Sequence, residues 1–105
     1  MASPAEMNDR NDMTLWASDV MLDDLLARAH DWSARPEREQ LDFFLEWEEM
    51  MDRLSAVAED EASGLLTTLQ RDRLTRLARR LIDSRPVIEE IGLDYPNLGR
   101  LSLAS

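Results

Sequence analysis

The fold of this chain is decided by residues 36–60, which read PEREQLDFFLEWEEMMDRLSAVAED. Apolar residues recur here three and four positions apart, which is the spacing of one face of an α-helix. Pro36 suits the first turn of a helix, where the amide hydrogen that proline lacks is not needed. Glu37 and Glu39 suit the positive end of the helix dipole. The pattern therefore predicts a long helix from Pro36 to about Asp60.

The apolar face of this predicted helix is broad. Its members are Phe43, Trp47, Met50, Leu54 and Val57, widened by Leu41, Phe44, Leu45, Met51 and Ala58. Each large apolar side chain contributes roughly 1.5–3 kcal/mol when it is fully buried, so the face should be covered by two helices or by a second chain. The chain has 105 residues and no cysteine, and hence no disulfide to stabilise it. We therefore expect a homodimer.

Another helix is predicted before this segment. Leucines at helical spacing, beginning with Leu15, indicate a helix from about Thr14 to Trp32. Residues 1–13 are polar and have no apolar period, so we expect them to form a flexible, disordered tail. The two long helices would form an antiparallel hairpin.

The C-terminal part of the sequence predicts a third helix and a short fourth one. Thr67 and Gln70 form a capping-box pattern, which predicts a helix that begins just after Thr67. Residues 84–86 read Ser-Arg-Pro, and a residue before proline avoids the helical region. We therefore expect that helix to stop there and a fourth to run over Pro86–Ile91, ended by Gly92.

Together these elements predict one all-α domain over residues 14–92, a three- to four-helix bundle built on a long helical hairpin. Residues 93–105 are expected to form a turn and a short tail. The leucines of the tail either dock into a groove on another protein or fold back over the helix ends to close the core. We favour the second arrangement, because exposed apolar segments are unusual in monomers.

The charge of the chain is divided unevenly. Residues 1–62 carry 17 Asp and Glu against five Arg, residues 63–105 carry five against seven Arg, and the net charge is −10. This anionic molecule should repel nucleic-acid phosphates and anionic membrane surfaces, so we expect neither as a partner. No apolar run approaches the ~18 residues of a spanning helix, and no secretory signal is visible. We expect a cytoplasmic protein from a prokaryote.

No catalytic or cofactor pattern stands out. The one histidine, His30, lies near a predicted helix end with no nucleophile pattern around it, so we expect a structural role. Asp42, Glu46 and Glu49 lie three and four apart, but carboxylate metal centres in bundles use Glu-x-x-His motifs, and none occurs. We therefore expect no enzyme activity, no cofactor, no resident metal and no small-molecule substrate.

The residues expected to bind a partner are Phe43, Trp47, Met50, Met51 and Leu54 on the broad apolar face, and Arg73, Arg76 and Arg80 on the arginine-rich third helix. The leading hypothesis is a non-enzymatic protein–protein interaction module, an adaptor, regulator or assembly factor, that self-associates. One alternative is an acidic mimic of nucleic acid that occupies a nucleic-acid-binding protein. Another is a carboxylate metal-binding bundle. The arginines could instead pair with the chain's own carboxylates.

Overall fold

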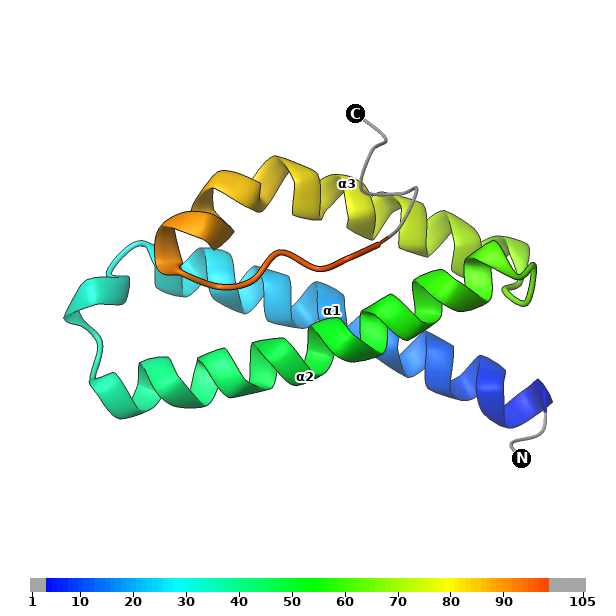
Figure 1. Cartoon of the computed structure of the whole chain (residues 1–105), viewed down its shortest axis with the longest axis horizontal. Coiled ribbons are helices and arrows are strands. Elements are labelled where there is room, and N and C mark those ends of the chain that lie inside the picture. The colour runs from blue at the N-terminus through cyan, green and yellow to red at the C-terminus, as the bar shows by residue number, and fades with distance from the viewer. Residues whose placement is uncertain (1–3, 99–105) are drawn as a thin grey trace.

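The computed structural model describes residues 4–98, with side chains from Asp9 onward, and this part of the chain is all-helical. It contains three long helices, α1 (Pro4–Ala29), α2 (Glu37–Ala62) and α3 (Thr68–Ile91), and a short 3₁₀ helix, η1 (Trp32–Ala34). α1 runs antiparallel to α2 and contacts both other helices (Figure 1). The all-α prediction is confirmed. None of the described helices combines the length and apolar composition needed to cross a membrane.

α1 begins much earlier than the sequence pattern indicated. It starts at Pro4 rather than at Thr14, so residues 4–13, predicted to be disordered, are helical. Residues 1–3 lie outside the described part of the chain. The helix also ends slightly early, at Ala29, before the turn that leads into η1.

Polar contacts hold the first part of α1 in place. Asn11 is buried and donates a hydrogen bond to the Asp60 carboxylate near the end of α2, at 3.3 Å. Asp12 accepts a hydrogen bond of 3.1 Å from the buried side chain of Gln70 in α3. Because these contacts join polar side chains, they leave no apolar period in the sequence.

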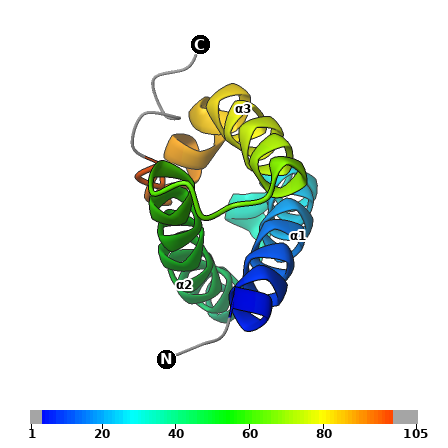
Figure 2. The same ribbon diagram turned by 90° about the vertical axis from the view of Figure 1, so that its right-hand side faces the viewer.

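The chain itself covers most of the broad face of α2, while Leu41 and Leu45 at its edge remain exposed. Phe43, Trp47 and Leu54 lie in the hydrophobic core, and so do Leu93 and Leu98 from the segment that follows α3. This segment, residues 93–98, is called the C-terminal strap here. It runs between α2 and α3, the side of the molecule that α1 leaves open (Figures 1 and 2). The buried part of the face therefore does not require a second chain, and the expected homodimer stays a prediction.

The strap is anchored by a hydrogen bond and by burial. The indole N–H of Trp47 donates to the backbone carbonyl of Asp94 at 2.9 Å. Pro96 and Leu98 are buried behind it. The prediction that the tail folds back to close the core is confirmed for Leu98, whereas the leucines after it lie outside the described residues.

α3 begins as predicted but does not stop as predicted. The capping box is formed: the Thr67 hydroxyl accepts from the Gln70 amide at 3.1 Å, and the Gln70 side chain accepts from the Thr67 amide at 3.0 Å. The predicted break and separate fourth helix are wrong, because α3 continues through Pro86 and ends at Gly92, whose φ is 91°. An interior proline costs roughly 3 kcal/mol, and burial of Ile88, two residues later, offsets much of this cost. The last turns of α3 bend away from its axis (Figure 1).

Replacing Leu98 by alanine should lower the free energy of unfolding by about 2–4 kcal/mol, because Leu98 is only 2% exposed and its loss leaves a cavity in the core. The matched control is Leu45→Ala in α2, where the side chain is 53% exposed, and this change should cost less than about 0.5 kcal/mol. Urea unfolding followed by circular dichroism measures both. Equal effects of the two substitutions would contradict a closing role for the strap.

The strap also predicts a pH dependence. Burial raises the pKa of the Tyr95 hydroxyl above its ordinary value of 10.0, and the nearby Arg85 guanidinium partly offsets the rise. The folded chain thus keeps this proton at pH values where the unfolded chain releases it. The stability it contributes is complete below about pH 10 and is lost as the pH rises through the folded pKa.

Tyr95 is the only tyrosine, so the near-ultraviolet absorbance of tyrosinate reports this one group. The titration midpoint of the native chain should lie above that of the chain unfolded in urea. Coincident midpoints would show that the hydroxyl is not buried by the strap.

Candidate functional site

Four of the five α2 residues predicted to bind a partner lie inside the core. Phe43, Trp47, Met51 and Leu54 are all buried, and the rings of Phe43 and Trp47 stack with their centroids 6.4 Å apart. In the folded chain these side chains belong to one hydrophobic core, so they are not exposed to a partner. Met50 is only half-buried and lines a groove described below.

A row of exposed apolar side chains lies instead on α1. Met13 and Trp16 are each 64% exposed, and Val20 is 46% exposed. They are three and four positions apart, so they share one face of the helix, and we call them the α1 ridge. Leu15 and Leu22 are buried in the core on another side of the same helix. α1 is therefore apolar on two sides, whereas the outer side of a surface helix is ordinarily polar.

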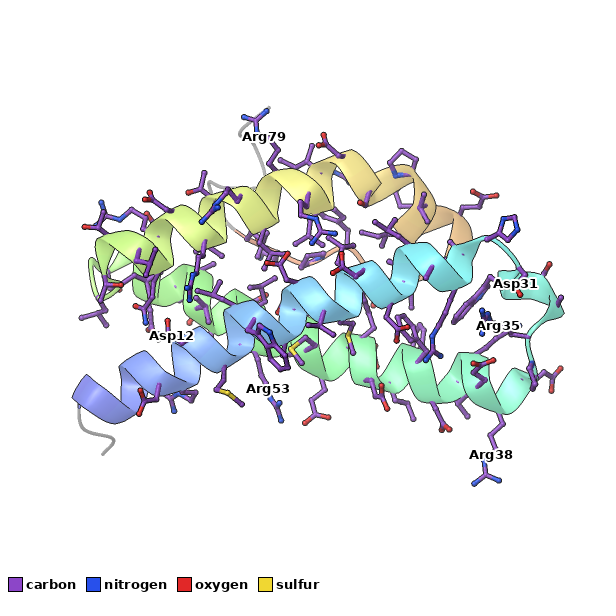
Figure 3. All side chains as sticks on the ribbon, turned by 180° about the vertical axis from the view of Figure 1, so that it is seen from behind. Asp12, Asp31, Arg35, Arg38, Arg53 and Arg79 are labelled. Carbon is purple, nitrogen blue, oxygen red and sulfur yellow. The ribbon has the colours of Figure 1, made fainter. Side chains whose placement is uncertain are left out.

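A groove of about 620 Å³ separates the α1 ridge from α2. Met13 and Ala17 form its α1 wall, and Met50 and Val57 contribute apolar surface from α2. Arg10 and Arg53 bring positive charge to the groove, and Glu59 and Asp60 bring negative charge. Figure 3 looks onto α1 and shows Arg53 extending from α2 into solvent.

A second groove, of about 600 Å³, lies between the ridge and α3. Trp16 and Val20 line one wall, and the three arginines predicted to bind a partner, Arg73, Arg76 and Arg80, line the other. A hollow of about 400 Å³ lies near its end and is lined by Met13, Trp16, Arg73 and two carboxylates, Asp9 and Asp12. The structure therefore brings all three predicted arginines beside the exposed tryptophan.

The three arginines differ in how they are held. Arg80 donates to the carboxylates of Asp19 and Asp23 on α1, at 2.5 Å each, and its pKa is raised above the ordinary value chiefly by the Asp23 hydrogen bond. Arg73 lies 3.9 Å from Asp12, the outer limit of an ion pair. Arg76 is exposed and has no ion pair among the residues that the structure describes. Pairing with the chain's own carboxylates therefore accounts for Arg80, in part for Arg73, and not for Arg76.

The described side chains do not form a metal-ligand cluster near the ridge or elsewhere. Over residues 9–98, no group of three or more His, Asp or Glu side chains is positioned to hold a metal ion. Asp42, Glu46 and Glu49 are exposed along α2, and His30 is exposed in the turn after α1. The described part of the chain therefore offers no set of ligands for the alternative of a carboxylate metal-binding bundle.

Sequence reasoning missed the α1 ridge for an identifiable reason. Met13 falls in the stretch expected to be disordered, so the local pattern does not place it on one helix face with Trp16 and Val20. Had helix α1 been extended by one turn, the i, i+3, i+7 spacing of these residues would have shown a second apolar face beside that of Leu15 and Leu22.

Comparison with known proteins leaves the site to be interpreted from its own residues. No family model, no curated protein and no solved structure matches the chain.

Proposed function

We propose that this protein is a non-enzymatic interaction module, an adaptor, regulator or assembly factor, that binds a protein partner through the α1 ridge and its flanking grooves. The observation that carries this proposal is the exposure of Trp16 between Met13 and Val20 on one helix face. Adjacent exposed apolar side chains on a small domain mark an interaction site when polar groups surround them.

The composition of the ridge supports this proposal. Tryptophan and arginine are enriched among the residues that dominate binding energy at interfaces, and methionine adapts its shape to a partner. Trp16 and Met13 supply the apolar centre, while Arg76 and the loosely held Arg73 remain available for carboxylates of a partner. Arg80 is already paired with α1, so its role is to fix the spacing of α1 and α3.

Replacing Trp16 by alanine should weaken partner binding by about 2 kcal/mol or more, roughly thirtyfold in Kd, if Trp16 is the centre of the interface. The measurement compares the proteins captured from a lysate of the host cell by the immobilised wild-type chain and by each variant. Leu41→Ala is the matched control, because Leu41 is 57% exposed on α2 and lines neither groove. Equal capture by wild type and Trp16→Ala, with unchanged thermal unfolding, would contradict the proposal.

The acidic surface of α2 favours a second candidate function, the mimicry of nucleic acid. Exposed carboxylates follow one another along α2 at Asp42, Glu46, Glu48, Glu49 and Asp52. Of these, only Glu49 is in an ion pair within the described part of the chain, with Arg53 at 2.6 Å. A dense set of unpaired carboxylates attracts the cationic surface of a nucleic-acid-binding protein.

This second candidate predicts capture that depends on charge. A variant with Asn or Gln at Asp42, Glu46, Glu48 and Asp52 should lose the captured protein, and Trp16→Ala should retain it. Duplex DNA should compete for that protein, and binding should weaken steeply as salt is added. Capture that resists both salt and DNA would contradict mimicry.

A further inference from the structure

We infer that the occupant of the α1 ridge is a second copy of this chain, whose own α1 packs antiparallel along the ridge. The inference rests on the proposed function, since it names the partner of the same surface. It is carried by three features of the ridge: its balanced charge, its symmetric spacing, and an arginine at one end that has no ion pair among the side chains described from Asp9 onward.

The charge around the ridge differs from that of the whole molecule. The chain carries a net charge of −10, but the side chains that line the two grooves and the hollow comprise five arginines and six carboxylates. A uniformly acidic partner would meet these carboxylates, and a uniformly basic one would meet these arginines. A patch with nearly equal numbers of both signs is complementary to itself, as a two-fold interface requires.

The ridge residues are three and then four positions apart, so their spacing is almost the same in either direction along the helix. When two α1 helices run antiparallel with Met13 level with Val20 of the second copy, Trp16 comes level with Ala17 of that copy. The two Trp16 side chains then lie next to the two-fold axis, and both are on the α3 side of the ridge, where Trp16 lines the second groove. The groove leaves space beside each exposed indole ring for the ring of the other copy.

The same register gives Arg10 a partner. Arg10 is exposed and has no ion pair within the described part of its own chain. In the antiparallel arrangement it is level with residues 23 and 24 of the second copy. Asp23 is held by Arg80 on the α3 side, whereas Asp24 lies on the α2 side, as Arg10 does, because Arg28 bridges Asp24 to Glu39 of α2. Two such contacts form at once, one at each end of the interface, because the arrangement is two-fold symmetric.

The charge outside the ridge predicts how this dimer responds to salt. Outside the contact, each copy presents an excess of carboxylates to the other, and salt screens the resulting repulsion. Self-association should therefore strengthen as salt is added. This response is opposite to the one expected for a nucleic-acid mimic.

Light scattering behind a sizing column, over a wide range of protein concentration, is the primary experiment. The wild-type chain should elute with twice the mass of the 12.1 kDa chain, and Trp16→Glu should elute as a monomer, with a dissociation constant raised by about a hundredfold or more. Leu41→Glu, a matched change at an exposed leucine on α2, should remain a dimer. Circular dichroism verifies that each variant is folded, as expected for exposed sites.

Cross-linking through introduced cysteines tests the antiparallel register, because the natural chain has no cysteine. A mixture of the single variants Met13→Cys and Val20→Cys should form a disulfide-linked heterodimer on mild oxidation. Neither variant alone should cross-link efficiently, because seven residues of helix separate the two positions by about 10 Å. Cross-linking of each variant with itself, and not in the mixture, would overturn the antiparallel arrangement.

Failure of this inference can be distinguished from failure of the proposed function. If the wild-type chain is monomeric at every concentration, the inference that a second copy binds the ridge is overturned. The same holds if Trp16→Glu leaves a dimer intact. If the monomeric chain still captures a host protein through Trp16, the interaction module stands with a different partner. If it captures nothing through Trp16, both are overturned.

Discussion

The burial of Trp47 is the constraint on which the arrangement of this chain depends. Its side chain is fully enclosed, and its indole N–H is paired with the carbonyl of Asp94. A buried N–H that is left unpaired costs about 1–3 kcal/mol, so the strap cannot leave this position without a penalty beyond its lost apolar contacts. The strap thereby closes the side of the core between α2 and α3, and the broad face of α2 becomes part of a single-chain core.

Because the strap covers the core side of α2, the exposed apolar residues of α1 become the main candidates for a binding surface. α1 contributes Leu15 and Leu22 to the core and still presents Met13, Trp16 and Val20 to solvent. The first turns of α1 are held mainly by polar contacts of Asn11 and Asp12, which position the helix without using its outer face. The helix is thus held firmly on one side and left free on the other, the arrangement that a preformed binding surface requires.

Sequence patterns predicted the features that depend on residues close together in the chain, and they failed for features that depend on contacts between distant residues. α2 and the start of α3 were predictable because helical spacing and the capping box of Thr67 and Gln70 are local signals. The helical residues 4–13 were not, because contacts such as Asn11 with Asp60 join residues 49 positions apart. Local rules also predict a break at Pro86, but the helix continues there and buries Ile88 in the core. These are cases of tertiary packing overriding local preference.

The same distinction explains the outcome at the candidate site. The periodicity of Phe43, Trp47, Met51 and Leu54 correctly indicates a buried face, but it carries no information on whether the covering atoms come from the same chain. Arg73, Arg76 and Arg80 lie beside the ridge because charged side chains on a helix avoid its buried face, and α1 is the neighbour on that side.

Under the proposed function, the uneven charge of the molecule would make the ridge selective. Exposed carboxylates on α2 oppose the approach of other anionic surfaces, including other faces of the same protein. Around the ridge the signs nearly cancel, so close approach there carries little repulsion, and at physiological ionic strength the remaining charges are screened beyond about 8 Å. An exposed tryptophan would ordinarily invite unselective association. In the proposed interaction, the surrounding charge would restrict association to partners that present an apolar surface and both signs of charge in the matching register.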